Sequence, residues 1–82
     1  MFFVYLLRSK SNPQLTYIGS TKDINRRLNE HNLGLSLFTK NNIPWELEVS
    51  IAFKDEIKAI NFEKYLKQGS GYAFAKKHFW SY

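Results

Sequence analysis

The sequence predicts an α+β fold in which helices pack around a three-stranded, mainly antiparallel sheet, with the element order β-β-α-β-α-α. Three observations predict it. Two short apolar segments near the N-terminus are separated only by a polar turn. An alternating segment follows in the middle of the chain, and two other segments repeat their apolar residues at helical spacing. With 82 residues, the chain is expected to form a single domain over residues 1–82.

The first two strands are expected to form an antiparallel hairpin. Residues 2–7 are a continuous apolar run rich in aromatic and branched side chains, typical of a strand buried on both faces. Residues 9–14 are polar and contain Asn12-Pro13, which favours a loop. Residues 15–18 return to an apolar pattern as the second strand, which Gly19 is expected to end.

The first helix is expected over residues 23–32, where Ile24 opens an apolar stripe at helical spacing. Thr21 or Asp23 is suited to cap its start, because a short polar side chain can accept from a free backbone N–H. Gly34 is suited to end it, because glycine adopts the left-handed conformation that closes many helices.

The rest of the chain supplies a third strand and two helices. Residues 45–53 alternate apolar and polar side chains, the pattern of a half-buried strand. Asp55 then caps a helix expected over residues 56–68. The segment 69–71 reads Gly-Ser-Gly and is expected to break that helix before a final one over residues 72–82. We expect the helices to cover one face of the sheet.

The charge balance favours a polyanionic partner. Twelve Lys and Arg side chains against seven Asp and Glu give a net charge of +5. Neutralising phosphates with such side chains releases condensed counterions, which drives binding to nucleic acid. The alternative is that the positive charge serves only solubility. Because the sequence has no cysteine, disulfides, thiolate metal sites and cysteine nucleophiles are excluded.

The sequence predicts a soluble, cytoplasmic protein without a membrane partner. No apolar run reaches the roughly 18 residues that a membrane-spanning helix needs. The apolar N-terminus has no basic region before it, and Arg8 interrupts it early. It is therefore expected to be a strand and not a signal peptide.

Several polar side chains lie on stripes that should face the core. Arg27 and His31 share one face of the first helix with Ile24 and Leu28, because these four residues are spaced three or four positions apart. Arg26 and Glu30, on a neighbouring face, are spaced as an ordinary solvated ion pair. Arg27 and His31 are therefore the functional candidates of this helix.

Glu63 occupies the corresponding stripe of the second long helix. A buried carboxylate is normally paired or holds a metal, and a salt bridge to Arg27 would explain both residues without any function. Tyr5 and Tyr17, on the two hairpin strands, can be ordinary core tyrosines. Together, however, these side chains supply a base, a phosphate-binding cation and a metal ligand, the groups that phosphodiester hydrolysis uses.

Two short tyrosine motifs and the string that follows them resemble a known family. The motifs are Val4-Tyr5-Leu6 and Tyr17-Ile18-Gly19, and residues 20–31 read Ser-Thr-Lys-Asp-Ile-Asn-Arg-Arg-Leu-Asn-Glu-His. With Glu63 on a later helix, this order and spacing closely resembles the GIY-YIG nuclease superfamily over essentially the whole chain. The chain looks most like the small stand-alone members, which are similar to the N-terminal nuclease module of the UvrC repair subunit.

The resemblance implies a role for each residue of the set. Tyr17 would help activate the attacking water, and Tyr5 would hydrogen-bond the scissile phosphate or the nucleophile. Arg27 would stabilise the charge on the phosphate, and His31 would transfer a proton or orient a neighbour. Glu63 would hold a single divalent cation, Mg²⁺ or Mn²⁺, since one carboxylate with bound waters suits a hard cation.

The sequence also departs from the family's pattern. Phe3-Val4-Tyr5 stands where the family has Gly-Ile-Tyr, and Ser20 stands where some relatives have lysine. Tyr72 replaces an arginine that the resemblance leads us to expect after the Gly-Ser-Gly segment. The C-terminal aromatics could stack on unpaired bases or, as we favour for most of them, pack in the core or a dimer surface. They are Tyr72, Phe74, Phe79, Trp80 and Tyr82.

The resemblance implies a metal-dependent endonuclease acting on DNA, with branched, damaged or single-stranded substrates and a role in repair or recombination. Without a separate DNA-binding module, binding would fall to the basic surface, to an accessory protein or to a homodimer. The side chains expected to contact DNA are Lys22, Arg26, Lys40 and Lys67. Two alternatives stay open: a catalytically weak or inert nucleic-acid-binding module, and a protein-interaction domain that uses the aromatic C-terminus.

Overall fold

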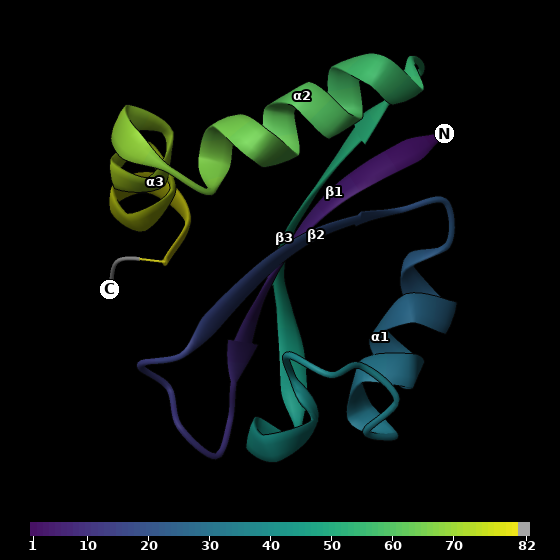
Figure 1. Cartoon of the computed structure of the whole chain (residues 1–82), viewed down its shortest axis with the longest axis vertical. Coiled ribbons are helices and arrows are strands. Elements are labelled where there is room, and N and C mark those ends of the chain that lie inside the picture. Colours follow the sequence, from purple (N-terminus) through teal and green to yellow (C-terminus); the bar gives the residue numbers. More distant parts are fainter. Residues whose placement is uncertain (81–82) are drawn as a thin grey trace.

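A computed structural model describes residues 1–80 of the chain and confirms the predicted element order (Figure 1). Its strands are β1 (Phe2–Ser9), β2 (Thr16–Thr21) and β3 (Trp45–Phe53). Its helices are α1 (Ile24–Asn32), α2 (Glu56–Leu66) and α3 (Gly69–Ala75). A 3-10 turn, Lys40–Asn42, lies in the loop between α1 and β3, and a π-helical turn, Lys76–Trp80, follows α3. The sheet has the order β2-β1-β3 and both pairings are antiparallel, so β2 is an edge strand.

The hairpin is longer than its apolar pattern predicted. β2 continues through Gly19 to Thr21, so the prediction that Gly19 ends the strand is wrong. Gly19 pairs directly with Tyr5 on β1. A Cβ at position 19 would lie 2.4 Å from the Tyr5 hydroxyl oxygen. The glycine is therefore required by close packing and not by a turn.

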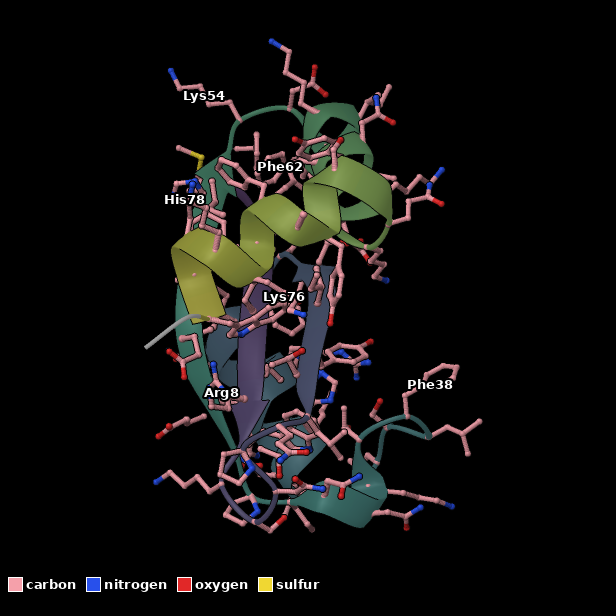
Figure 2. The ribbon with its side chains drawn as sticks, turned by 90° about the vertical axis from the view of Figure 1, so that its left-hand side faces the viewer. Arg8, Phe38, Lys54, Phe62, Lys76 and His78 are labelled. Carbon is pink, nitrogen blue, oxygen red and sulfur yellow. The ribbon has the colours of Figure 1, made fainter. Side chains whose placement is uncertain are left out.

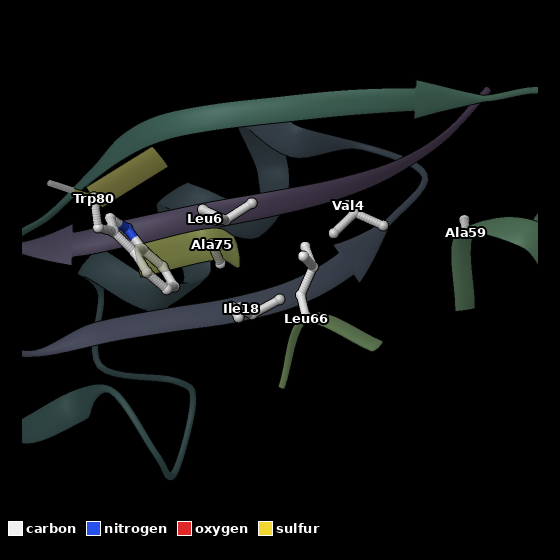
Figure 3. Close-up of a cluster of buried hydrophobic side chains, with 7 residues drawn as sticks. All are labelled: Val4, Leu6, Ile18, Ala59, Leu66, Ala75 and Trp80. Atoms are coloured by element: carbon white, nitrogen blue, oxygen red, sulfur yellow. The ribbon is translucent and has the colours of Figure 1, made fainter. Parts of the chain in front are cut away.

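Helices cover both faces of the sheet, which corrects the expectation that they cover one. In Figure 1, α2 and α3 lie on one side of the strands and α1 on the other. The core under α2 and α3 contains Val4 and Leu6 of β1 together with Leu66 and Trp80 (Figure 3). The core under α1 contains the intervening residues of β1, Tyr5 and Leu7. The continuous apolar run of β1 is thus buried on both faces, as predicted.

A β-bulge lets the apolar residues of β3 serve both cores. The register shifts between Leu6 and Leu7 of β1, which pair with Val49 and Leu47 of β3. Before the bulge, Trp45 packs in the core under α1. After it, the odd-numbered residues from Val49 onwards pack in the core under α2 and α3. An inserted residue moves the following side chains to the opposite face, because side chains alternate along a strand.

The predicted helix caps are present, but the boundary between α2 and α3 differs from the prediction. Asp23 accepts from the backbone N–H of Arg26, and Asp55 accepts from that of Ile57. α3 starts at Gly69, not at residue 72, and the Gly-Ser-Gly segment therefore forms its first turn.

The tight packing of α3 on α2 explains this start. At Gly71, a Cβ would lie 1.7 Å from the carbonyl oxygen of Tyr65, so the glycine allows α3 to turn back closely onto α2. Residues 81–82 of the predicted final helix, including Tyr82, lie outside the described residues. Within residues 1–80, no helix combines the length and the apolar character needed to cross a membrane.

Candidate active site

Two tyrosines and a histidine from three elements meet on the α1 face of the hairpin. Tyr5 comes from β1, Tyr17 from β2 and His31 from the last turn of α1. Their ring centroids lie 6.2 Å (Tyr5–Tyr17), 5.8 Å (Tyr5–His31) and 5.0 Å (Tyr17–His31) apart. The side chains predicted from the tyrosine motifs and from α1 therefore form one cluster.

His31 is fully buried and is held at both ring nitrogens. Its Nε2 lies 2.9 Å from the Tyr5 hydroxyl, and its Nδ1 lies 2.7 Å from Oγ1 of Thr39. Thr39 is also fully buried, and its carbonyl oxygen accepts from the indole Nε1 of Trp45 at 2.9 Å. Thr39 thus links the imidazole to the loop between α1 and β3. Sequence reasoning missed it, because that loop shows no periodic pattern.

Burial keeps both Tyr5 and His31 in their neutral forms near neutral pH. Desolvation, together with repulsion from Tyr17, raises the pKa of Tyr5 from 10.0 to about 12, against the opposing effect of Arg27. Desolvation and the charge of Arg27 lower the pKa of His31, against the opposing effect of Glu30. A neutral imidazole has one donor and one acceptor nitrogen. If Thr39 donates to Nδ1, then Nε2–H donates to Tyr5, whose own hydrogen is left to bind a ligand.

Arg27 borders this cluster from α1. Its guanidinium donates to Oε1 of Glu30 at 3.0 Å, and it also interacts with Tyr5. Arg26 pairs with the other oxygen of Glu30 at 3.9 Å, as the helical spacing predicted. The Arg27 side chain is 30% exposed, so it can reach a ligand at the rim while Glu30 holds it in place.

Glu63 approaches from the opposite face, around the edge strand β2. Its Oε1 accepts from the hydroxyl of Ser20 at 2.6 Å, and its Oε2 pairs with Nζ of Lys67 at 2.6 Å. Ser20 follows Gly19 directly, so the carboxylate lies close to the tyrosine cluster and its charge acts on Tyr5. A salt bridge from Glu63 to Arg27, the purely structural alternative, is not present.

The surroundings of Glu63 fit a hard divalent cation. Within residues 1–80 there is no group of three or more His, Cys, Asp or Glu side chains suited to hold a metal. A single carboxylate completed by waters is nevertheless a common way to hold Mg²⁺. The Lys67 ammonium pairs with this carboxylate, and its side chain is 47% exposed. Ser20, whose contact with Glu63 was not predicted, fixes the other oxygen.

The side chains expected to contact DNA are distributed over the end of β2, α1, the 3-10 turn and the end of α2. Lys22 follows β2 and lies 5.2 Å above the ring centre of Phe2. Arg26 is exposed on α1, and Lys40 is exposed on the 3-10 turn. Lys67 is the partner of Glu63. All four are accessible, but only Lys67 touches a residue of the predicted catalytic set through a hydrogen bond.

Comparison with known proteins identifies the family. The model of the family described as "GIY-YIG catalytic domain" matches residues 1–77. The structure-specific endonuclease subunit SLX1 of Malassezia globosa is 41% identical over 68 residues, which cover 77% of this chain and 15% of that protein. The corresponding protein of Candida dubliniensis is 38% identical over 82 residues, with 92% of this chain and 27% of that protein covered. The chain therefore spans less than a third of these two relatives.

Smaller relatives are matched over more of their length. A UPF0213 protein of Vibrio campbellii is 38% identical over 66 residues, covering 79% of this chain and 62% of that protein. The solved structure of a UPF0213 protein from Bacillus halodurans superposes with a TM-score of 0.55 at 28% identity, covering 94% of this chain and 82% of the other. Because the family match spans nearly the whole chain and the fold agrees, this chain belongs to the GIY-YIG nuclease family.

Proposed function

We propose that this protein is a divalent-metal-dependent endonuclease that hydrolyses phosphodiester bonds in DNA. One observation carries the proposal. Glu63 reaches around the edge of β2 to Ser20, next to the cluster of Tyr5, Tyr17 and His31. A carboxylate able to hold a metal and phenolic groups able to bind a phosphate or a water thus lie on either side of one strand edge. GIY-YIG nucleases generally use a divalent metal, which supports the same assignment.

In this mechanism each side chain acts on a phosphate placed at the edge of β2. Tyr5 is neutral and donates a hydrogen bond to a phosphate oxygen or to the nucleophile, since burial keeps its hydroxyl protonated. Tyr17, partly exposed beside it, positions and activates the attacking water. Arg27 stabilises the charge that develops on the phosphate. His31 holds the Tyr5 hydroxyl in place.

Glu63 would hold the cation, Mg²⁺ or Mn²⁺. When bound there, such a cation polarises the phosphate and stabilises the leaving oxygen. Lys67 would then leave Oε2 of Glu63 and become available to the DNA backbone, because a carboxylate paired with a metal no longer needs the ammonium.

A second candidate function is a nucleic-acid-binding module without catalysis. It is favoured by the Lys67–Glu63 contact of 2.6 Å, which places a lysine on the carboxylate that the metal would need. Such a module would bind DNA through its net charge of +5 and would show salt-dependent affinity without metal.

The substrate class and the assembly extend the proposal. The SLX1 relatives are named structure-specific endonuclease subunits. We therefore propose branched or otherwise partly unpaired DNA as the substrate, with a role in repair or recombination. Since those proteins are named as subunits, we also propose that an accessory protein or a second copy contributes to targeting.

The test is cleavage of plasmid and branched DNA in Mg²⁺ or Mn²⁺ by wild type and by Glu63→Gln. The amide keeps the shape and can still accept from Ser20, but it removes the charge that holds a cation. A metal contributes several kcal/mol to such reactions, so cleavage should fall by at least about 100-fold. The matched control is Glu46→Gln, which should cleave like wild type. Glu46 is an exposed carboxylate on β3 whose salt bridge to Lys10 is 3.7 Å long.

Either of two results would contradict the proposal. Cleavage that Glu63→Gln leaves unchanged would show that the carboxylate does not hold the metal. If the pure wild-type protein binds DNA but cleaves none of these substrates with either metal, the protein is the binding module instead.

A further inference from the structure

We propose that Tyr72 is a stacking platform for an unpaired nucleotide next to the scissile phosphate, in a groove that runs over the edge of β2. This inference rests on the proposed nuclease function. It assigns to this chain a binding site for the base of a single-stranded segment, and it gives a physical reason why partly unpaired DNA would be chosen.

The groove joins the tyrosine cluster to α3. It has a volume of about 190 Å³ and is lined by Thr16, Tyr17 and Ile18 of β2, Lys67 at the end of α2, and Tyr72 and Trp80. Tyr17 is therefore shared between the catalytic cluster and this groove. A ligand that reaches Tyr17 from this side also contacts Tyr72.

A second hollow lies at the other end of β2, which sets a direction for the bound strand. It has a volume of about 90 Å³ and is lined from β2 and the residue after it by Ser20, Thr21 and Lys22, and from α2 by Ala59 and Ile60, among others. Glu63 lies on α2 between these two residues and Lys67, one helical turn from each. The two hollows thus flank the Glu63–Ser20 contact. A DNA strand that runs from one hollow to the other along β2 places one phosphate at Glu63 and a nucleotide in each hollow.

Tyr72 has the exposure and the support of a stacking platform. It is 41% exposed, and its ring packs against that of Trp80 in a T-shaped arrangement with centroids 6.4 Å apart. Trp80 is itself buried, so the Tyr72 ring rests on the core and not on a mobile segment. A ring held this way loses little freedom when a base stacks on it.

Positive charge surrounds the Tyr72 ring. The Lys76 ammonium lies 5.8 Å from the ring centre. A further hollow of about 230 Å³ has Lys76 and Arg8 in its lining, with Arg8 paired to Glu48 at 3.0 Å, and another of about 490 Å³ brings Lys76 and Lys77 to the ring. Figure 2 shows Arg8 and Lys76 on the same side of the molecule. An exposed aromatic ring within a basic groove is the combination that binds single-stranded nucleic acid, because bases stack while cations follow the backbone.

The other C-terminal aromatics do not share this position. Trp80 is 6% exposed and belongs to the core, and Phe79 packs against it. Phe74 is 40% exposed but lies against His78, with ring centroids 4.5 Å apart, and it lines none of these hollows. Of the aromatic side chains in residues 72–80, Tyr72 alone is both exposed and in the groove beside Tyr17.

The occupant must be unpaired, because a base within a duplex is already stacked on both faces and cannot lie against a protein ring without leaving the helix. Removing such a platform weakens binding by roughly 5- to 150-fold per stacked base. The resemblance led us to expect an arginine at this position, which would contact phosphates. Tyr72 instead favours the base, and the surrounding lysines supply the phosphate contacts.

The test compares two DNAs in Ca²⁺, to limit cleavage: a duplex with a single-stranded flank, and the same duplex fully paired. Affinity is measured by fluorescence anisotropy for wild type, Tyr72→Ala and Tyr72→Phe. Phe38→Ala is the control, since Phe38 is 80% exposed and points away from the molecule in another loop (Figure 2). Thermal unfolding of each variant establishes that it is folded.

We expect Tyr72→Ala to lose about 5- to 150-fold in affinity for the flanked DNA and to bind the paired duplex like wild type. Tyr72→Phe, which keeps the ring, and the control should retain wild-type affinity for both. Abasic nucleotides in the flank should weaken wild type by a similar factor and should not weaken Tyr72→Ala further. This last result identifies the base as the partner of the ring.

Equal losses on both DNAs, or no effect of abasic nucleotides on wild type, would overturn the subsite. Cleavage assays in Mg²⁺ separate this failure from that of the nuclease. Cleavage that depends on Glu63 but is indifferent to Tyr72 removes only the subsite. Base-dependent binding through Tyr72 without any cleavage supports the subsite and removes the nuclease.

Discussion

Replacing Gly19 by alanine should disable the site at a cost in stability of at most about 2.5 kcal/mol. The alanine Cβ would lie 2.4 Å from the hydroxyl oxygen of Tyr5, 2.6 Å from its Cζ and 3.0 Å from Cε2 of Tyr17. Ordinary contact begins at 3.4 Å. The Tyr5 hydroxyl must therefore move by about 1 Å, which disturbs its 2.9 Å hydrogen bond with His31.

The expected effect on catalysis is larger than the effect on folding. Overpacking a core typically costs about 1–3 kcal/mol, and replacing a strand glycine returns roughly 0.5–1 kcal/mol of that through the unfolded state. The net destabilisation is then about 0–2.5 kcal/mol. A displacement of 1 Å in a positioned group can, in contrast, lower the rate about 100-fold. We expect kcat to fall by that order in Gly19→Ala.

A second glycine provides the matched control. Gly34 has φ = +78°, where an alanine is strained by roughly 1–2 kcal/mol, and a Cβ there would meet only the Lys40 side chain at 4.0 Å. Gly34→Ala should therefore be destabilised to a similar degree without moving Tyr5. Urea unfolding measures stability, and single-turnover cleavage in Mg²⁺ measures the rate. If Gly19→Ala cleaves as fast as Gly34→Ala, the argument that Gly19 positions the tyrosines is wrong.

Three further predictions follow from the same contacts. Because the pKa of Tyr5 is raised to about 12, the folded state keeps that proton longer than the unfolded chain. The contribution of the protonated Tyr5 hydroxyl to the free energy of unfolding is therefore fully present below pH 10, and it is lost as the pH rises through 12. Urea titrations at pH 9.5 and 11.5 should show wild type losing about 2 kcal/mol more than Tyr5→Phe; equal losses would contradict the buried, protonated hydroxyl. Thr39→Val should cost roughly 1–3 kcal/mol by leaving Nδ1 of buried His31 unpaired, while Thr39→Ser keeps the hydroxyl and most of the stability. Nitrogen chemical shifts of His31 should show two tautomers in Thr39→Val and one in Thr39→Ser. Lys22→Ala should reduce the slope of log affinity for DNA against log salt by about one. The control is Lys54→Ala, which should leave the slope unchanged because Lys54 is exposed and points away at one end of the molecule (Figure 2).

The sequence was sufficient for elements whose residues carry a local signal. The alternation in β3 and the caps Asp23 and Asp55 identify the strand and the starts of α1 and α2 without reference to the rest of the chain. The extent of β2 was not accessible in this way. Its last residues are polar, and they are kept in the strand by pairing with β1, which is a property of the partner and not of the segment.

The same distinction applies to the candidate site. Arg27 and His31 could be assigned to one face of α1 from their spacing, and His31 is indeed buried. That Thr39 holds His31 could not be predicted, because Thr39 lies eight positions further along the chain in a loop, and a loop has no fixed period. The partners of Glu63 were also missed. Helical spacing places a side chain on a face, but it does not say which strand that face meets.

The edge position of β2 explains how one site can use groups from both faces of the sheet. Gly19 and Ser20 are consecutive, so one packs under the Tyr5 ring on the α1 side while the other reaches Glu63 on the α2 side. In a central strand, the neighbouring strands would separate these two sets of side chains. At a free edge, one phosphate can touch both. In the proposed mechanism the substrate backbone lies along β2. We therefore predict that a partner that extended the sheet at β2 would block cleavage, since its added strand would occupy the space that the phosphate needs.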